Sequence, residues 1–348
     1  MNLLNETCGR IDDVNQSICE QARSRIDQLI KPIGSLGRIE ELFIQLAGIT
    51  RNLFPEMNKK AVVVMAADHG VVQEGVTAYP STVTAIQTQL FSKGVTGVCA
   101  FAKQTGAEVV PVDIGVAADI NVEGVRQHKV KYGTNNFTKG PAMTREEAIQ
   151  SLEVGIEISN ELAEKGVHVI ATGEMGIGNT TASAAITSVV TGADPYEVTG
   201  LGANYPVEKL LHKAAIVSKA IEVNQPDRSD GVDILAKVGG LEIGGMAGVM
   251  IGCAANRIPV VVDGFISSAA ALIATTIEPN VKQYLIPSHL SKEAGAKKAL
   301  EHLGLKPMFD LDLRLGEGSG AVLAFPLIEA ATAMNREMIT FEEAGLKV

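Results

Sequence analysis

Residues Ala61–Ala67 read A-V-V-V-M-A-A and run directly into Asp68-His69-Gly70. This uninterrupted apolar run, rich in β-branched side chains, is typical of a strand buried on both faces of a parallel sheet. Helix-like stretches separate it from further apolar runs, and this alternation predicts parallel strands joined by crossover helices. Four more apolar runs of this kind are Glu108–Val116, Val167–Gly173, Pro259–Gly264 and Tyr284–Ser288.

A sixth strand is predicted over Leu311–Leu315, L-D-L-R-L, where leucine alternates with charged residues. The glycine loop Gly316–Gly320 follows, and a helix is expected from Ala321. Glycine permits backbone conformations closed to other residues, so a substrate can approach the main chain there. Glu317 is the only titratable residue of the loop, at a position where open α/β sheets bind ligands. A tight turn carrying a solvated acid explains the loop equally well.

The predicted fold is α/β, a three-layer α/β/α domain with a mostly parallel, six-stranded, Rossmann-like sheet. This large domain, which would bind the ligands, is expected over residues 59–305. Residues 1–58 together with 326–348 are expected to form a small helical domain. Its first two helices are predicted over Ile11–Ile30 and Arg38–Phe54, from apolar residues spaced three and four apart.

The composition disfavours several kinds of partner. A formal net charge of −10 without any Lys/Arg cluster argues against nucleic acid or an anionic membrane surface. The four cysteines have neither the spacing of a zinc site nor that of a disulfide framework. The N-terminus lacks the features of a signal peptide, and the apolar stretches are too short for a membrane span. We therefore expect a cytoplasmic protein.

Two other glycine-rich loops have the features of an anion site. Gly173–Thr181, G-E-M-G-I-G-N-T-T, joins a strand to a helix, whose N-terminal N–H groups can bind phosphate. Gly200–Asn204 precedes Lys213, which could add a positive charge. A capped glycine turn and an ordinary surface lysine remain the alternative. His69 could form part of a metal site, although a hydrogen-bonded structural histidine is the commoner case.

If the strands are parallel, the polar residues at their carboxyl ends face one crevice. These residues are Asp68, His69, Asp113, Glu174, Asp263, Ser288 and Glu317. Several familiar sites are excluded, because the chain has no Gly-Lys pair for a P-loop and no G-x-S-x-G elbow.

Seven segments resemble, in order and spacing, the nicotinate-nucleotide:dimethylbenzimidazole phosphoribosyltransferase family. They are K-P-I-G-S-L-G-R, V-M-A-A-D-H-G-V, G-E-M-G-I-G-N-T-T, G-A-N-Y-P, D-G-F-I-S-S-A-A-A, Y-L-I-P-S-H and R-L-G-E-G-S-G-A, between about residues 20 and 335. This family moves phosphoribose from nicotinate mononucleotide to a benzimidazole and releases nicotinate. The product, α-ribazole 5′-phosphate, supplies the nucleotide loop of cobalamin. The resemblance implies a homodimer with small-molecule substrates and without a metal or cofactor.

The resemblance implies that Glu317 is the general base, and the chemistry agrees. Nicotinate leaves as a neutral pyridine ring, so the leaving group needs no acid. The attacking benzimidazole carries a proton on its second ring nitrogen, which a carboxylate can remove. Attack opposite to nicotinate would invert the β-nucleotide to the α-product.

The resemblance also implies that ten further residues surround the substrates. Gln87 and Leu315 are expected in the base pocket, and most of the others around the nucleotide. The full set is Gln87, Glu174, Gly176, Thr180, Gly202, Lys213, Asp263, Ser291, Leu315 and Gly316. Tyr79 stands where the family often has a small hydroxyl residue, so the preferred base remains open among benzimidazoles, purines and phenols.

Two other functions remain compatible with the same crevice. One is a different nucleotide glycosyl transfer or hydrolysis, with phosphate or water as the acceptor. The other is a sensor that binds the nucleotide or the base without turnover.

Overall fold

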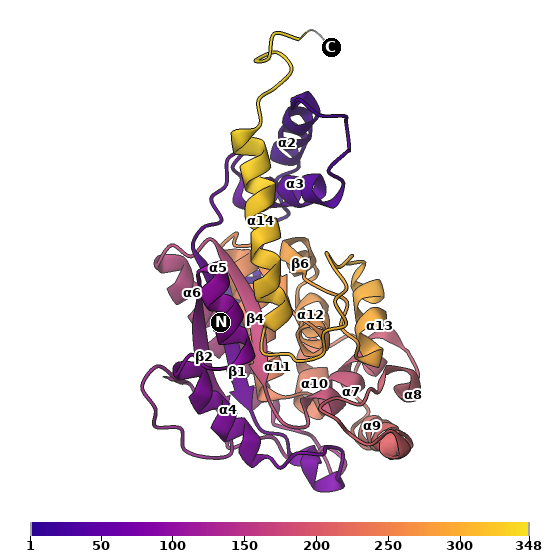
Figure 1. Ribbon diagram of the computed structural model, residues 1–348. Helices are drawn as coiled ribbons and strands as arrows, with labels where there is room; N and C mark the ends of the chain where they lie inside the picture. Colours follow the sequence, from indigo (N-terminus) through magenta and orange to yellow (C-terminus); the bar gives the residue numbers. More distant parts are fainter. Residues whose placement is uncertain (1, 347–348) are drawn as a thin grey trace.

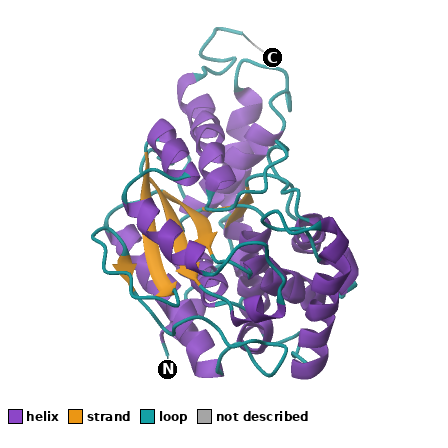
Figure 2. Cartoon of the chain, turned by 60° about the horizontal axis from the view of Figure 1, so that its bottom comes forward, coloured by secondary structure: helices purple, strands orange, loops and turns teal. Residues whose placement is uncertain are grey.

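Six parallel strands form the centre of the molecule in the order β3-β2-β1-β4-β5-β6 (Figure 1). The computed structural model describes residues 2–346. The strands are β1 (Lys60–Ala67), β2 (Ala107–Gly115), β3 (Arg126–Gln127), β4 (Val169–Met175), β5 (Val260–Val262) and β6 (Leu285–Pro287). Helices lie on both sides of this sheet (Figure 2). The predicted three-layer α/β fold with a parallel sheet is confirmed.

Strand β1 is buried along its whole length because helices cover both faces of the sheet. Val63 and Met65 belong to one apolar core, and Val62 and Val64 belong to a second core on the opposite face. The first core includes α6 (Arg145–Glu164), α10 (Gly231–Val238), α11 (Leu241–Ala255) and α12 (Phe265–Ile277). The second includes α2 (Gln16–Gln28), α3 (Arg38–Thr50), α5 (Gly97–Thr105) and α14 (Ser319–Glu337).

The remaining elements are six further helices and three 3₁₀ segments. They are α1 (Leu3–Cys8), α4 (Thr82–Ser92), α7 (Asn179–Thr191), α8 (Pro195–Val198), α9 (Leu210–Asn224), α13 (Ala294–Leu303), and the 3₁₀ segments η1 (Gly70–Glu74), η2 (Val207–Lys209) and η3 (Pro279–Tyr284). Helices α7 and α9 among them also contribute to the first core. No helix within residues 2–346 has the length and apolar character needed to cross a membrane.

Helices α6 and α11 approach each other so closely that only glycine fits between them. A Cβ atom on Gly248 would lie 1.9 Å from the carbonyl oxygen of Leu152. A Cβ atom on Gly155 would lie 2.0 Å from the carbonyl oxygen of Gly245. Backbone-to-backbone packing of this kind suits a chain in which only 4% of the residues are aromatic and Trp is absent.

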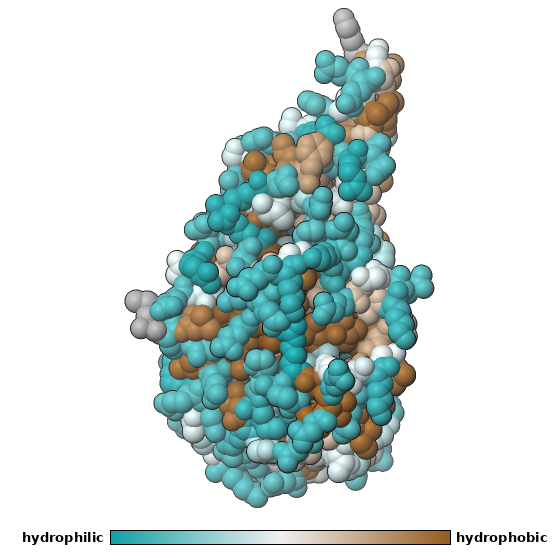
Figure 3. All heavy atoms as spheres, turned by 90° about the vertical axis from the view of Figure 1, so that its left-hand side faces the viewer, coloured by the Kyte–Doolittle hydropathy of each residue, from teal (hydrophilic) through white to brown (hydrophobic). Residues whose placement is uncertain are grey.

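The N-terminal helices differ in part from the prediction. Helices α2 and α3 project from the α/β body beside the second half of α14, so the molecule tapers toward that end (Figure 1). Hydrophilic residues predominate on the side of the molecule shown in Figure 3. The first helix is shorter than expected, and residues 3–8 form α1, which packs against α6 and α11 instead. The proposed domain boundaries stay a prediction. One apolar core contains residues of α2, α3 and the sheet.

The predicted strand over Leu311–Leu315 is wrong. The segment is an extended loop in which Asp312 has a φ of +58°, which breaks the regular alternation of a strand. Leu311 and Leu315 are each 59% exposed, so no buried face exists there. The strand that completes the set of six is instead β3, at the edge of the sheet, whose two polar residues pair with Val112 and Asp113 of β2. So short a polar strand has no apolar run from which it could be predicted.

Candidate active site

A cavity of about 250 Å³ opens at the carboxyl ends of β4, β5 and β6. The strand order reverses between β1 and β4, and ligands of open α/β sheets bind beside such a reversal. All eleven catalytic and substrate-binding candidates from the sequence line this one cavity. Asp68, His69, Asp113 and Ser288 are not among the lining residues, so the crevice involves fewer strand ends than expected.

The Glu317 carboxylate is held in place by two donors. Its Oε1 accepts a hydrogen bond from Gln87 Nε2 at 2.6 Å, and its Oε2 accepts one from the Val98 N–H at 3.0 Å. Val98 lies in the first turn of α5, where the helix dipole favours a negative charge. The carboxylate is therefore oriented before any substrate binds.

The environment of Glu317 makes it a stronger base than a free glutamate. The residue is only 6% exposed, and burial raises the pKa of its carboxyl group above the ordinary value. The hydrogen bonds from Val98 and Gln87 oppose this shift because they stabilise the charged form. A pKa raised in this direction strengthens the carboxylate as a base.

The backbone around Glu317 has a left-handed conformation over three successive residues. The φ angles are +84° at Gly316, +64° at Glu317 and +88° at Gly318. Gly316 lies close to a second carboxyl group, since a Cβ atom there would lie 2.3 Å from Glu174 Oε1. Glu317 adopts this costly conformation without being glycine, as residues at functional sites often do.

Asp263 fixes the turn that carries Glu317. Its Oδ2 accepts the N–H of Gly318 at 3.2 Å, and its Oδ1 accepts the N–H of Ala321 at 2.9 Å. The side chain thus caps the first turn of α14. Asp263 lines the cavity as predicted, but its visible contacts are with the protein backbone.

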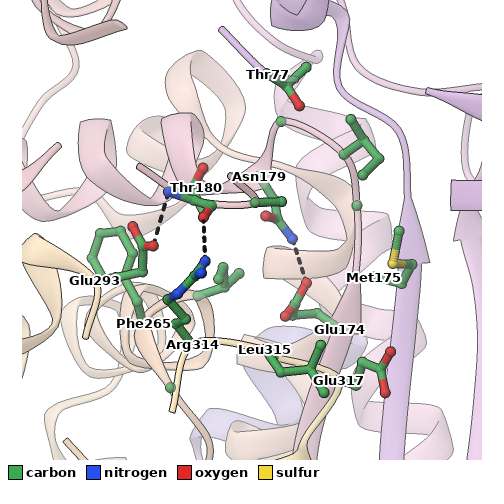
Figure 4. Close-up of a pocket in the computed structure, with 18 of the residues that line it drawn as sticks. Thr77, Glu174, Met175, Asn179, Thr180, Phe265, Glu293, Arg314, Leu315 and Glu317 are labelled. Atoms are coloured by element: carbon green, nitrogen blue, oxygen red, sulfur yellow. Dashed lines mark hydrogen bonds between the residues drawn. The ribbon is translucent and has the colours of Figure 1, made fainter. Parts of the chain in front are cut away.

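Glu174 lies beside Glu317 and is a second carboxyl group with a raised pKa (Figure 4). Burial, followed by the nearby charges of Glu242 and Asp263, raises the pKa of Glu174 to about 8. Its carboxyl group accepts a hydrogen bond from Asn179 Nδ2. At neutral pH, Glu174 is therefore mostly protonated, whereas a base must be ionised.

A buried contact between a histidine and a glutamate supports the loop that follows β4. His69 Nε2 lies 2.6 Å from Glu242 Oε1, and both side chains are fully buried. A Cβ atom on Gly176 would lie 3.3 Å from His69 Nε2 and 3.4 Å from Glu242 Oε1. His69 therefore belongs to the support beneath the cavity.

The other end of the cavity contains a buried lysine. Lys213 Nζ donates to Thr180 Oγ1 at 2.8 Å. Gly202 adjoins both groups, since a Cβ atom there would lie 2.8 Å from Thr180 Oγ1 and 3.2 Å from Lys213 Nζ. Burial lowers the pKa of Lys213 to about 8, and the charge of Glu293 opposes the shift. This arrangement of a hydroxyl, an ammonium and the start of α7 is suited to binding an anion.

Two lining residues, Glu293 and Arg314, were missed by the sequence analysis. They lie on the same side of the pocket (Figure 4). Glu293 Oε1 accepts the N–H of Gly202 at 2.9 Å, and Arg314 Nη1 donates to the Gly202 carbonyl at 3.4 Å. Arg314 was interpreted as the solvent side of a strand, and the only sequence signal for Glu293 is its closeness to Ser291.

Known proteins similar to this chain share one activity in their names. A family model described as phosphoribosyltransferase matches residues 11–346. The chain is 58% identical to the nicotinate-nucleotide–dimethylbenzimidazole phosphoribosyltransferase of Alkaliphilus metalliredigens, with 100% of each chain covered. The enzyme of that name from Clostridioides difficile is 52% identical, with 99% of each covered. The crystal structure of the Thermus thermophilus enzyme matches with a TM-score of 0.91 at 41% identity, covering 96% of this chain and 99% of that one.

Proposed function

The chain belongs to the nicotinate-nucleotide–dimethylbenzimidazole phosphoribosyltransferase family, and we propose that it transfers phosphoribose from nicotinate mononucleotide to 5,6-dimethylbenzimidazole or a related base. The products are α-ribazole 5′-phosphate, for the nucleotide loop of cobalamin, and nicotinate. The observation that carries this proposal is the fixed Glu317 carboxylate in the same cavity as a buried Lys213.

In the proposed reaction, one benzimidazole nitrogen attacks the anomeric carbon of the ribose. The bond from that carbon to the nicotinate nitrogen breaks, and its electron pair neutralises the pyridinium. The second benzimidazole nitrogen then bears an acidic proton, which Glu317 accepts. Positioned general bases of this kind contribute roughly 10²- to 10⁴-fold in rate. The fixed carboxylate supports this role, because proton removal requires no rearrangement of Glu317.

The two ends of the cavity supply different binding chemistry. Gln87, Leu315 and Glu317 form the end proposed for the acceptor base. Thr180, Lys213 and the Gly202 loop form the end proposed for the phosphate. An acceptor that attacks from the side opposite to nicotinate gives the α-anomer from the β-nucleotide. We therefore propose a single displacement with inversion.

We also propose that the protein is a homodimer. Ile30, Ile33 and Leu36 are 41%, 75% and 41% exposed in the connection between α2 and α3. Ile339, 49% exposed, lies beside them, since the N–H of Ile30 donates to its carbonyl at 3.0 Å. We name these four side chains the tapered-end patch. A second copy of the chain covering the patch would remove this apolar surface from water.

The proposal is tested by mass spectrometry with nicotinate mononucleotide and a panel of benzimidazole, 5,6-dimethylbenzimidazole, adenine and phenol. We expect nicotinate release only with an acceptor present, together with an α-linked nucleotide in equal amount. Reactions without an acceptor are the control. Ribose 5-phosphate formed without a base would identify a hydrolase instead. Tight nucleotide binding without turnover with any base would identify a sensor.

A further inference from the structure

We propose that Glu293 is a positioning residue for the nucleotide phosphate. It holds the Gly202 turn beside Lys213, and its negative charge keeps that lysine cationic without occupying the N–H groups of the lysine. The inference rests on the proposed phosphoribosyl transfer and assigns a further residue to the recognition of its phosphate.

The Glu293 side chain is turned away from its own helix. Glu293 occupies the N-cap position of α13, but its side chain makes no capping hydrogen bond there. Helices are usually capped by shorter side chains, such as those of Ser, Thr, Asp and Asn. Instead, Glu293 Oε1 accepts the N–H of Gly202 at 2.9 Å, in a loop 91 residues earlier in the chain. The side chain therefore contributes to the cavity wall, not to the cap of α13.

The loop between α8 and η2 closes around this carboxylate. A Cβ atom on Gly200 would lie 2.1 Å from Glu293 Oε2, so the loop backbone passes directly beside that oxygen. Arg314 Nη1 donates to the Gly202 carbonyl at 3.4 Å, on the same side of the pocket as Glu293 (Figure 4). Glu293 and Arg314 thus bind the N–H and the carbonyl of the one residue that adjoins Lys213 Nζ.

One oxygen of Glu293 is buried without a hydrogen bond. Glu293 is 8% exposed, and its Oε2 has no hydrogen-bond partner among residues 2–346. Burying a charged oxygen in this way is costly unless positive charges lie nearby. Burial raises the pKa of Glu293, and the charges of Lys213 and Arg314 oppose this rise. The carboxylate and the two cations therefore stabilise one another within the cavity wall.

Lys213 keeps N–H groups available for a ligand. An ammonium group has three N–H donors, and one of them is bound to Thr180 Oγ1 at 2.8 Å. Among residues 2–346, Lys213 Nζ has no other hydrogen bond and no carboxylate oxygen within 4.0 Å. Burial lowers the pKa of Lys213 to about 8, and the charge of Glu293 opposes the shift. Glu293 thus favours the charged lysine from a distance, which leaves two donors for a phosphate.

The other groups that face Lys213 keep one charge state between pH 6.5 and 9.5. The ring centre of Tyr205 lies 5.7 Å from Lys213 Nζ, and burial raises the pKa of this phenol above its ordinary value. Arg314 stays protonated at any of these pH values. The contact from α7, which packs against α9, is the hydroxyl of Thr180.

The remaining elements packed against α9 add charges that do not line the cavity. They are Glu197 of α8, Glu208 and Lys209 of η2, and Asp233 and Lys237 of α10. Glu197 pairs with Lys298, and Asp233 pairs with Lys237. A change in phosphate affinity over this pH range is therefore assigned to Lys213 and Glu293.

The test measures the dissociation constants of nicotinate mononucleotide and nicotinate riboside by calorimetry from pH 6.5 to 9.5. The riboside lacks the phosphate, so the ratio of the two constants reports the phosphate contact. Glu293→Gln keeps an oxygen for the Gly202 N–H but removes the charge. Without that charge Lys213 loses its proton at lower pH. We expect the affinity advantage of the nucleotide to fall at lower pH than in the wild type, and to be about 3- to 10-fold smaller at pH 7.5.

Three further variants separate the charge from the hydrogen bond. Glu293→Asp keeps the charge but reaches less far, so it should weaken nucleotide binding by a similar factor at every pH. Combining Glu293→Gln with Lys213→Gln should give the ratio of Lys213→Gln alone, because the charge acts through that lysine. Glu301→Gln removes an exposed acid of α13 outside the cavity and should match the wild type.

A Glu293→Gln profile that coincides with that of the wild type would overturn the proposal. Tighter nucleotide binding at every pH would also overturn it, since Glu293 would then only repel the phosphate. Equal losses for the nucleotide and the riboside would do the same, because they would indicate general damage. Each of these results leaves the proposed function standing, whereas failure of the wild-type protein to form an α-nucleotide with any base would refute that function.

Discussion

Glu317 combines a strained backbone with a well-anchored side chain. A non-glycine residue with a left-handed backbone costs roughly 1–3 kcal/mol and persists only where its surroundings hold it. Asp263 supplies that hold by binding the turn, while Gln87 and Val98 orient the carboxylate. The sequence could identify Glu317 as the titratable residue of a glycine loop. The family resemblance placed Gln87 in the same pocket, but the sequence could not show the hydrogen bond between these two side chains, which lie 230 residues apart along the chain.

The charge of Lys213 gives a prediction for pH. Burial lowers the pKa of this ammonium group to about 8, so its charge is lost as the pH rises through that value. We expect the KM for nicotinate mononucleotide to rise above pH 8, by about tenfold per pH unit at most. The KM for nicotinate riboside, which lacks the phosphate, should not follow this rise. Steady-state kinetics from pH 6.5 to 9.5 with both substrates checks this.

Titration of Glu174, whose pKa is also about 8, would affect both substrates, so the comparison isolates the phosphate contact. Lys213→Gln should abolish the difference between the two profiles. Lys209→Gln, at an exposed position one turn earlier, is the matched control and should retain it. A nucleotide KM that stays flat to pH 9.5 would contradict the phosphate role of Lys213.

At the scale of elements, the long buried strands and the glycine loops of the pocket were predictable, but the conformation of Leu311–Leu315 was not. The apolar run of β1 and the corresponding runs of β2 and β4 reflect burial on both faces, which leaves a strong pattern. Leu311–Leu315 has the alternation of a strand for another reason, because Leu315 lines the cavity while remaining exposed. An apolar residue that faces a cavity can therefore produce the alternation expected of a buried strand, although the segment has no buried face.

The contact between α6 and α11 predicts a sharp sensitivity to side-chain size. A methyl group on Gly248 would meet the Leu152 carbonyl at 1.9 Å, and a backbone atom cannot move aside as a side chain can. We expect Gly248→Ala to lower the free energy of unfolding by about 1–3 kcal/mol. Chemical denaturation followed by circular dichroism measures this.

Gly9→Ala is the matched control. A Cβ atom there would have only ordinary contacts at 3.5 and 3.7 Å, so a change within about 0.5 kcal/mol is expected. Equal stability of Gly248→Ala and the wild type would show that the two helices can separate without cost.

At the scale of the whole molecule, the strand order determines where the site lies. The chain leaves β1 for β2 and β3 and returns to β4 on the other side, which opens a crevice at the carboxyl edge. The prediction of a shared edge for the strand ends followed from parallel topology alone. Which strand ends line the cavity depends on how their side chains pair. Asp113 Oδ2, for example, lies 2.7 Å from Lys129 Nζ, and Asp113 does not line the cavity.

The proposed homodimer predicts a specific response to charge at the tapered-end patch. Light scattering coupled to size exclusion should give twice the chain mass of 36.6 kDa. Ile33→Asp should shift the mass toward the single chain, because a buried unpaired carboxylate is costly. Val223→Asp, 48% exposed on α9, is the control and should remain dimeric. A wild-type mass of one chain at all concentrations would rule out the dimer.

The central claim is that Glu317 removes the acceptor proton, and Glu317→Gln tests it most directly. An amide keeps the shape of the side chain but cannot act as the base. Single-turnover kinetics with 5,6-dimethylbenzimidazole should show a rate lowered by roughly 10²- to 10⁴-fold. Calorimetry should show nicotinate mononucleotide affinity within a few-fold of the wild type. A Glu317→Gln variant that transfers phosphoribose at the wild-type rate would contradict the account.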